Sequence, residues 1–485
     1  MSKNGVINGV SKYFLMQLLI LIICILFINI RGVPQDGDSY LDAIKKIGWI
    51  SNTVFVLDML VMHKLKKNIL DLTIVFSFFF FLFCNGQIML YSLGIDPFQM
   101  LIFKTSSYKE IYEAAVYFLF SMIVYFMGAI IPLGQKKDIN EIQPIKDPRL
   151  IAAIRDTSVI LIVLSIVPFL YIFLTKIETS LVYGYSALYK ETTQVSGIVG
   201  YTAKLFIPAM FMLLYVNYNQ TYNKRIIHSI LLIISVLSLL SGNRGDGLSI
   251  IVTLLIIKQL YGEQFTGKKI IKLLLIAVLI IMIIPVLALF RGMENRSISD
   301  FGDIFLDSIT NSDNNLIISS ISELGGTMNA FILTKRAVPT MEGFHYGISY
   351  LASIAMIIPS QLMGGFSFAQ YAALDIWLQD IHKMSYGPGF SITAETYYNF
   401  GWIGGIAFTF LIGLFFSKIL NLKSNDNDKN EVLRLLSVIF LYNSIIVARF
   451  PFHNTVRNIV YLFIIPYLII MTIYSRKCRN QFHKN

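Results

Sequence analysis

The segment 241–247 combines residue types that can bind an anion. It reads Ser-Gly-Asn-Arg-Gly-Asp-Gly, so three glycines surround Arg244 and Asp246. Glycine lets the backbone approach a ligand closely, exposed amides in such a turn can cradle an anion, and a guanidinium can hold a phosphate at two points. The segment therefore predicts a phosphate-binding arginine. The alternative is a tight hairpin in which Arg244 and Asp246 pair with each other in water.

Two further segments carry arginines that could do the same chemistry. Residues 291–296 read Arg-Gly-Met-Glu-Asn-Arg, and residues 449–457 read Arg-Phe-Pro-Phe-His-Asn-Thr-Val-Arg. Arg291 can instead complement a helix dipole or reach the lipid headgroups. In the second segment, Arg449 and Arg457 can hold a phosphate while the neighbouring rings stack on a sugar. An interfacial aromatic belt with anchoring cations is the competing explanation.

Side chains that could transfer a proton gather between residues 336 and 395. Arg336 comes shortly before His345, a lone histidine, and lone histidines are more often structural than catalytic. The other ionisable groups of this stretch are Asp375, Asp380, His382, Tyr386 and Glu395. A solvated loop carries such residues in any case, so their types alone do not single out one of them. Their spacing is not that of a metal-ligand set, and we expect no metal.

The segment 394–405 brings Glu395, Tyr397 and Asn399 to the start of an apolar run. It reads Ala-Glu-Thr-Tyr-Tyr-Asn-Phe-Gly-Trp-Ile-Gly-Gly. Aromatic residues followed by glycines are typical of a membrane helix that is anchored at the interface and packs closely on its neighbours. From physical chemistry alone, this segment is therefore an anchored helix start.

The elements that position these residues are membrane helices. The chain has 485 residues, of which 55% are hydrophobic and only 14% charged, whereas soluble domains have roughly 25% charged residues. We predict an all-α polytopic membrane protein with about twelve spans and a retained first helix. The expected spans are 13–30, 46–62, 69–94, 111–133, 157–175, 200–217, 226–241, 248–260, 270–290, 402–420, 434–449 and 458–474.

The basic residues predict how the spans are oriented. With the N-terminus inside, most lysines fall in cytoplasmic loops, as the positive-inside rule requires. The net charge of +11 therefore reflects orientation and does not point to nucleic acid. Arginine departs from the rule, because 7 of the 13 arginines fall outside: Arg31, Arg244, Arg291, Arg296, Arg336, Arg449 and Arg457. We expect both termini to be cytoplasmic and several of these arginines to have a function at the outer face.

The expected organisation has three parts. Residues 1–290 hold nine spans, residues 291–401 form a large extracytoplasmic loop, and residues 402–485 hold the last three spans and a basic tail. Long ordered loops are usually functional. Within the loop, residues 316–334 are expected to form a half-buried helix, and residues 348–363 an interfacial or re-entrant segment.

The turn around Arg244, the Arg291-Gly292 loop start and the stretch from Glu395 to Gly404 together resemble the O-antigen and capsular repeat-unit polymerases of the Wzy type. The resemblance extends to the architecture of most of the chain. It implies a GT-C-like fold and a glycosyltransferase in the bacterial cytoplasmic membrane that needs no cofactor or metal. Such enzymes transfer a polymer from undecaprenyl diphosphate to the sugar of another lipid-linked repeat unit at the outer face.

That reaction assigns roles to the candidate residues. The leaving diphosphate needs cations, and we expect Arg244, Arg291, Arg449 and Arg457 to bind it. The acceptor hydroxyl needs a base, for which the candidates are Glu395, Asp246 and His345. Further substrate contacts are expected from Arg336, Tyr397, Asn399 and His453.

Two alternatives share this architecture. An O-antigen ligase would use a different acceptor, and a flippase for the same lipid-linked oligosaccharide would need charges inside its spans. The spans here carry few charges, which favours an enzyme that works at one face. Besides membrane lipids and the lipid-linked oligosaccharide, the expected partners are the chain-length regulator and the flippase of the same pathway.

Overall fold

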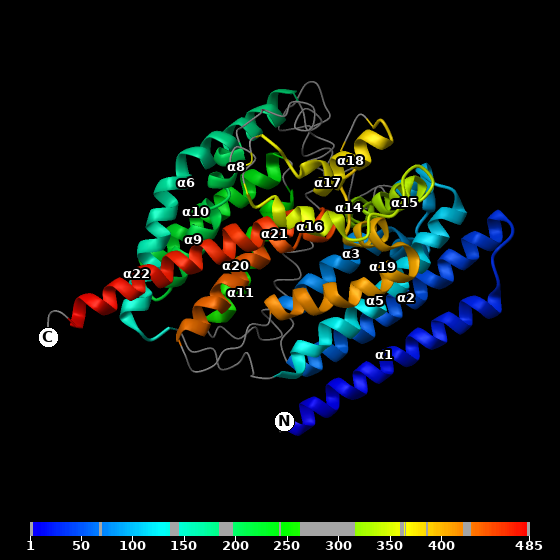
Figure 1. Cartoon of the computed structure of the whole chain (residues 1–485), viewed down its shortest axis with the longest axis horizontal. Coiled ribbons are helices and arrows are strands. Elements are labelled where there is room, and N and C mark those ends of the chain that lie inside the picture. Colours follow the sequence, from blue (N-terminus) through cyan, green and yellow to red (C-terminus); the bar gives the residue numbers. More distant parts are fainter. Residues whose placement is uncertain are drawn as a thin grey trace. The chain divides into compact units, whose positions relative to one another are not determined.

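The computed structural model describes the chain as a set of helices in two compact units. It describes residues 3–66, 70–135, 145–183, 197–241, 244–261, 316–358, 363, 365–384, 387–420 and 428–482, and this part of the chain contains no strand. Unit 1 comprises Met1–Ile139, Ile321–Asn421 and Ser444–Arg457, and unit 2 comprises Asn140–Ser320, Leu422–Asn443 and Asn458–Asn485. Figure 1 shows the helices of both units. Segments distant in sequence therefore build each unit.

Eight helices of the described chain are long and apolar enough to cross a membrane. They are Gly9–Arg31, Leu72–Ser92, Tyr108–Leu133, Pro148–Thr179, Val199–Val216, Thr221–Leu239, Ile392–Leu420 and Phe452–Asn480. Each overlaps one of the expected spans, so the prediction of a helical polytopic membrane protein is confirmed. The short expected spans 46–62, 248–260 and 434–449 fall on other helices, and 270–290 lies outside the described residues. The number twelve stays a prediction.

Unit 1 is built around two buried membrane helices. Its N-terminal part contains α1 (Lys3–Arg31), α2 (Gly37–Lys66), α3 (Leu72–Ser92), α4 (Leu101–Thr105) and α5 (Tyr108–Ile130). Ser107 and Glu110 form a capping box that starts α5, since each side chain accepts from the backbone N–H of the other. Most of α3 and of α5 is buried, so these helices form the core against which the site is built.

The second half of unit 1 comes from the predicted loop and from the residues after it. It contains the second half of α14 (Leu316–Gly325), α15 (Met328–Ala337), α16 (Ile348–Ala355), α17 (Ala369–Ala372), α18 (Leu374–Ile381), α19 (Ile392–Leu420), the 3-10 turn η6 (Val447–Arg449) and nearly all of α21 (Phe452–Asn458). The predicted helix at 316–334 is thus two short helices with a break at Gly326 and Thr327. The described part of the predicted loop is largely helical. The boundaries at 291 and 402 stay predictions.

Helices α5 and α19 pack backbone against backbone. A Cβ at Gly128 would overlap the carbonyl of Phe410, and one at Gly413 would overlap the carbonyl of Tyr125. Glycines at a helix crossing allow this approach, which is a common way for membrane helices to associate. The crossing therefore fixes α19 on the core of unit 1.

Helix α19 is broken at Gly401. The residue has φ 67° and ψ −155°, a conformation that glycine adopts readily and other residues rarely do. The ring of Phe344 also lies 3.0 Å from the place of a Cβ there. The expected span at 402–420 begins directly after this break. The preceding helical segment, which carries Glu395 and Asn399, can therefore run in a different direction from the span.

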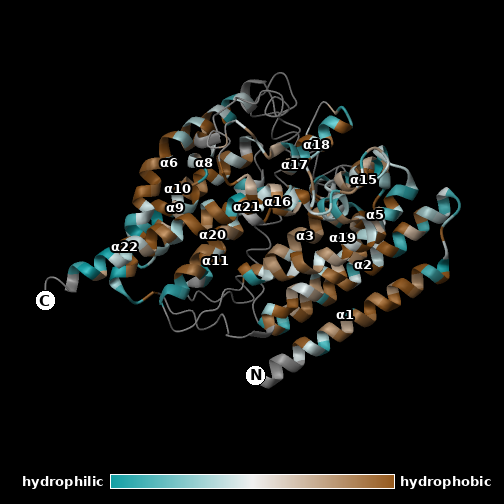
Figure 2. Cartoon of the chain, viewed as in Figure 1, coloured by the Kyte–Doolittle hydropathy of each residue, from teal (hydrophilic) through white to brown (hydrophobic). Residues whose placement is uncertain are grey.

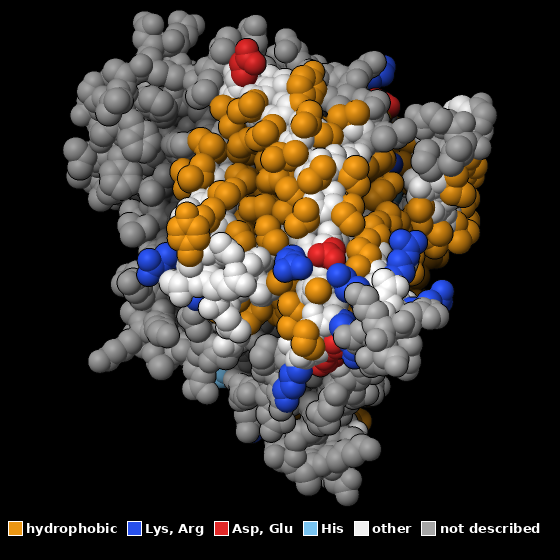
Figure 3. All heavy atoms as spheres, turned by 90° about the vertical axis from the view of Figure 1, so that its left-hand side faces the viewer, with side chains coloured by type: hydrophobic (Ala, Val, Ile, Leu, Met, Phe, Trp, Pro, Cys, Tyr) orange, Lys and Arg blue, Asp and Glu red, His pale blue; other side chains and the backbone are white. Residues whose placement is uncertain are grey.

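Unit 2 contains the remaining helices. They are α6 (Pro148–Tyr183), α8 (Gly197–Ala203), α9 (Phe206–Val216), α10 (Thr221–Ser241), α11 (Arg244–Leu260), α20 (Asp428–Ser444), the π-helical turn η7 (Ile459–Ile464) and α22 (Ile465–Phe482). Helix α6 carries apolar residues along most of its length (Figure 2). Two of them, Val163 and Val167, are 68% and 72% exposed. Figure 3 shows a broad apolar surface on the side where α6 lies, with Lys and Arg side chains along one border. Such a surface is expected where a helix faces lipid.

Candidate functional site

Glu395 lies at the centre of a buried polar cluster in unit 1. Its side chain is 1% exposed. Its Oε1 accepts a hydrogen bond from Ser349 Oγ at 2.7 Å, and its Oε2 accepts one from the backbone N–H of Phe452 at 2.7 Å. Buried carboxylates are costly unless such donors satisfy them. The carboxylate therefore joins three segments of the chain: α16, α19 and the start of α21.

Asn399 lies one helical turn after Glu395 and completes the cluster. Its Nδ2 donates to Ser349 Oγ at 2.8 Å and to the carbonyl of Glu395 at 2.9 Å. Its Oδ1 accepts from the backbone N–H of Gly347 at 2.9 Å. Gly347 has φ 89°, a left-handed conformation that suits glycine. Asn399 thus fixes the start of α16 against α19 and orients the hydroxyl that donates to Glu395.

Helix α16 places its polar side toward this cluster and its apolar side outward. Ser349 and Ser353 are buried, whereas Ile348, Leu351 and Ile354 are about half exposed or more. These isoleucines and the leucine recur every three residues, so they share one face of the helix. This reversed amphipathic pattern is typical of a helix that meets lipid on one side. The interfacial or re-entrant segment that the sequence predicts at 348–363 stays a prediction, and its residues 359–362 lie outside the described residues.

His345 belongs to an aromatic stack beside the cluster. Its ring lies on Tyr398, with centroids 4.0 Å apart and an interplanar angle of 6°, and Trp377 meets Tyr398 edge to face at 4.7 Å. Burial lowers the pKa of His345, and Glu342, whose Oε2 is 3.4 Å from His345 Nε2, opposes this shift. The histidine is thus favoured in its neutral form, in which it can accept a proton.

The segment that carries Arg449 and His453 contacts the Glu395 cluster through the backbone of Phe452. Arg449 is exposed, and its Cζ lies 5.6 Å from the ring centroid of Phe83. The carbonyl of Arg449 accepts from the backbone N–H of Phe390 at 3.3 Å. His453 is buried, with its Nδ1 2.9 Å from the carbonyl of Ala372. The guanidinium of Arg449 is thus available at the surface, while His453 serves packing between α21 and α17.

Tyr397 and Arg457 lie on the same elements as these residues. Tyr397 is 3% exposed, its hydroxyl donates to the carbonyl of Val338 at 3.3 Å, and its ring meets Phe331 edge to face. These contacts place Tyr397 in the core of unit 1, where it supports the first part of α19. Arg457 lies on α21 and is half-buried.

Arg336 is held by an acid of α5. Its Nε and Nη2 donate to Glu110 Oε1 and Oε2 at 2.5 and 2.9 Å, and Nη2 also donates to the carbonyl of Thr105 at 3.0 Å. The neighbouring Lys335 pairs with Glu113. Two adjacent cations of α15 therefore bind two acids on one side of α5.

Replacing Arg336 with alanine is expected to destabilise the protein by about 1–2 kcal/mol, because a bidentate and partly buried ion pair is lost. Thermal unfolding in detergent measures this loss. The double variant Arg336→Ala/Glu110→Ala should lose less than the two single variants together, since each single change leaves the other charge unpaired. Lys109→Ala, at an exposed position of α5, is the control. Unchanged stability together with weaker substrate binding would instead support the substrate contact expected from the sequence.

The other expected site residues lie elsewhere. Arg244 and Asp246 form the beginning of α11 in unit 2, and Arg291 lies outside the described residues. One residue of the cluster could not be predicted from the sequence: Ser349, which donates to Glu395. Asp375, one of the ionisable residues named in the sequence, lies at the start of α18 and interacts electrostatically with Glu395. The signal for Ser349 was two serines four residues apart, Ser349 and Ser353, in an otherwise apolar helix.

Comparison with known proteins gives the family. A search of curated proteins and a search of solved structures found no match to the chain. A family model described as O-antigen polysaccharide polymerase Wzy matches residues 11–480, which is nearly the whole sequence. The match agrees with a helical polytopic membrane protein whose acidic and arginine-bearing segments meet in one unit. The chain therefore belongs to the O-antigen polysaccharide polymerase family.

Proposed function

We propose that this polymerase forms its glycosidic bond beside Glu395. Members of the family act in the membrane on lipid-linked oligosaccharide repeat units. In our proposal the growing polymer leaves its undecaprenyl diphosphate and is transferred to a sugar hydroxyl of a second lipid-linked repeat unit, at the outer face of the bacterial cytoplasmic membrane. The ligase and flippase alternatives find no support in the comparisons, and the site chemistry suits transfer.

One observation supports this location above others. Glu395 accepts hydrogen bonds both from Ser349 of α16 and from the backbone of Phe452, three residues after Arg449. A candidate base is thereby fixed next to a segment with two arginines, although more than fifty residues separate them in sequence. Base and cations in one place are what the reaction requires, because a hydroxyl must lose a proton while a diphosphate gains charge.

The proposed step transfers one proton and one glycosyl group. The acceptor hydroxyl takes the position that Ser349 Oγ occupies and donates its proton to Glu395 Oε1. The acceptor oxygen then forms a bond to the anomeric carbon of the lipid-linked polymer. The bond between that carbon and the diphosphate oxygen breaks, and its electron pair stays on the diphosphate. His345 and Asp246 are the alternative bases that the sequence left open.

The leaving diphosphate is assigned to arginines. Arg449 and Arg457 flank the Phe452 backbone contact with Glu395, and Arg244 and Arg291 are the further candidates from sequence. Guanidinium groups stay charged and hold two phosphate oxygens at once, so they can neutralise the leaving group where other glycosyltransferases use a divalent cation. The proposal therefore includes metal-independent transfer.

The topology belongs to the same proposal. It comprises twelve spans in a GT-C-like architecture, both termini in the cytoplasm and residues 291–401 outside. The chain-length regulator and flippase of the pathway would be partners at that face. The lipid tail would remain in the bilayer, which the apolar outer face of α16 meets close to Glu395.

The direct test is polymerisation by the purified full chain in lipid nanodiscs. With a synthetic undecaprenyl-diphosphate repeat unit and EDTA, we expect a ladder of products that differ by one repeat unit. Undecaprenyl diphosphate carrying only the first sugar is the matched control and should give none. A ladder that forms only after Mg²⁺ is added would remove the metal-independent part of the proposal. No ladder with several complete repeat units, with or without metal, would contradict the polymerase mechanism itself.

A further inference from the structure

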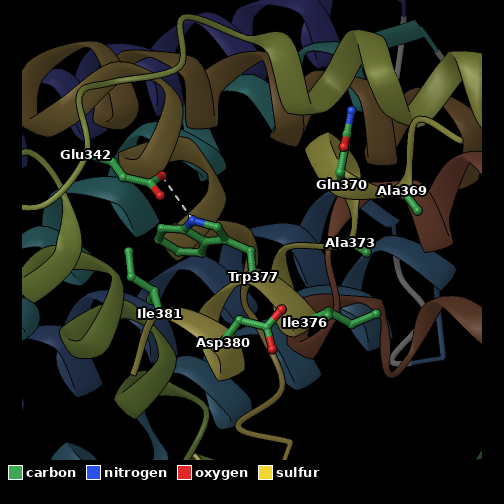
Figure 4. A pocket seen from close by; sticks show the side chains of 8 residues that line it. All are labelled: Glu342, Ala369, Gln370, Ala373, Ile376, Trp377, Asp380 and Ile381. Atoms are coloured by element: carbon green, nitrogen blue, oxygen red, sulfur yellow. Dashed lines mark hydrogen bonds between the residues drawn. The ribbon is translucent and has the colours of Figure 1, made fainter. Parts of the chain in front are cut away.

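A cavity of about 560 Å³ opens beside α18 in unit 1. Its lining includes Glu342, Gln370, Ala373, Ile376, Trp377 and Asp380. Figure 4 shows the indole of Trp377 in the middle, with its ring nitrogen hydrogen-bonded to Glu342 and with Asp380 nearby. The size lies within the range of roughly 300–1,000 Å³ that is usual for small-molecule sites. The cavity can therefore hold a ligand of more than one sugar ring.

The indole that lines the cavity is fixed in place. Trp377 Nε1 donates to Glu342 Oε2 at 3.0 Å, and its ring meets Tyr398 edge to face. Tyr398 in turn stacks on His345. A braced aromatic ring loses little conformational freedom when a ligand packs on it, which favours binding.

The chemistry of the lining matches an uncharged saccharide. A pyranose ring has apolar C–H faces that can pack on an indole, and hydroxyls at its edge. Carboxylates accept hydrogen bonds from hydroxyls, and the Gln370 amide can both donate and accept. Among the described residues, those that line the cavity include two acids, Glu342 and Asp380, and neither lysine nor arginine. Like charges repel, so this lining disfavours the diphosphate part of the substrate.

Helix α18 connects the cavity with the Glu395 cluster. Trp377 and Asp380 of this helix line the cavity, whereas Asp375 at its start interacts electrostatically with Glu395. Tyr398, which contacts Trp377, lies on α19 only three residues after Glu395. A saccharide in the cavity would thus lie against α18, whose Trp377 contacts α19, the helix that carries the proposed base.

We propose that this cavity is a saccharide subsite that binds sugars of the repeat unit by packing on Trp377 and by hydrogen bonds to Glu342, Asp380 and Gln370. The assignment of these sugars to the polymerase substrate rests on the function proposed above. Binding here positions the lipid-linked chain and takes no part in proton transfer.

The first test measures binding without the lipid. The probe is a saccharide of two repeat units, prepared by partial acid hydrolysis of the polymer made by the source strain, and its binding to the purified full chain is followed by saturation-transfer NMR. We expect Trp377→Ala to weaken binding about tenfold and Asp380→Asn, at an exposed position, to weaken it by a smaller factor. Trp49→Phe, at a tryptophan of α2 that is 50% exposed, should leave it unchanged. Maltotetraose is the control saccharide.

The second test uses the polymerisation ladder. Trp377→Ala and Asp380→Asn should raise the KM for the lipid-linked repeat unit and leave kcat nearly unchanged, since they remove binding and not chemistry. If the wild type forms a ladder but neither substitution changes saccharide binding or KM, the subsite is wrong and the polymerase stands. If no ladder forms but Trp377→Ala still weakens saccharide binding, the subsite stands and the proposed function is wrong. The subsite is also wrong if the wild type binds the probe no more tightly than it binds maltotetraose.

Discussion

Replacing Glu395 with glutamine is expected to slow polymerisation by about 10²–10⁴-fold, the usual contribution of a general base. Glutamine has the shape of the carboxylate, and its Oε1 can still accept from the Phe452 N–H while its Nε2 donates to Ser349 Oγ. The hydrogen bond from Phe452 is therefore kept, and the one with Ser349 remains with its direction reversed. What is lost is the ability to take up the proton of the acceptor hydroxyl. The measurement is the initial rate of ladder formation at saturating substrate.

Two other variants separate base chemistry from structure. Asp38→Asn changes an exposed acid at the start of α2 and should keep the wild-type rate. Ser349→Ala removes the hydroxyl that donates to Glu395 but keeps the carboxylate, so we expect a smaller loss than with Glu395→Gln. The thermal unfolding midpoint of each variant shows whether the helices remain packed. A folded Glu395→Gln protein with the wild-type rate would contradict the role of Glu395 and shift attention to His345.

From the sequence, individual site residues could be predicted better than the residues that contact them in the fold. Glu395 and Asn399 were singled out because they precede an apolar run that resembles a polymerase segment. Ser349 was missed, since its contact with Glu395 spans 46 residues and no local pattern reveals such a pair. Arg336 was expected to contact substrate, yet Glu110, 226 residues away, binds its guanidinium. An arginine on the outer side of the membrane, against the positive-inside rule, can therefore be explained by an acidic residue of the same protein as well as by a ligand.

Most membrane helices could be predicted from the length of their apolar runs, and the exceptions have physical reasons. Helix α2 contains Asp58, which is buried and accepts a hydrogen bond from Tyr13 of α1 at 2.5 Å. A helix that satisfies a buried acid through a neighbouring helix is less hydrophobic than one that faces lipid alone, and α2 is not among the eight described helices that are long and apolar enough to cross a membrane. The break at Gly401 coincided with the predicted start of a span at 402, because glycine both ends the aromatic segment and permits the required backbone conformation. The direction of the segment before the break depends on long-range contacts.

Replacing Gly413 with alanine is expected to destabilise the protein by about 1–3 kcal/mol, the usual range for overpacking. The added methyl would overlap the carbonyl oxygen of Tyr125 and lie 3.0 Å from the backbone nitrogen of Ala129. Backbone atoms cannot rotate away as a flexible side chain can, so α19 must move from α5. Gly200→Ala in α8 is the control, because nothing lies within 4 Å of its Cβ. It should be neutral or slightly stabilising, since alanine favours a helix over glycine.

The double variant Gly128→Ala/Gly413→Ala tests whether this crossing is one structural unit. A Cβ at Gly128 would meet Phe410 and Leu414, so both methyl groups would lie between the same two helices. Once one methyl has separated α5 from α19, the second should cost less, and the double variant should lose less stability than the sum of the single ones. Additive losses would show that each helix adjusts locally. Because α19 also carries Glu395, separation of the helices should slow polymerisation, whereas Gly200→Ala should not.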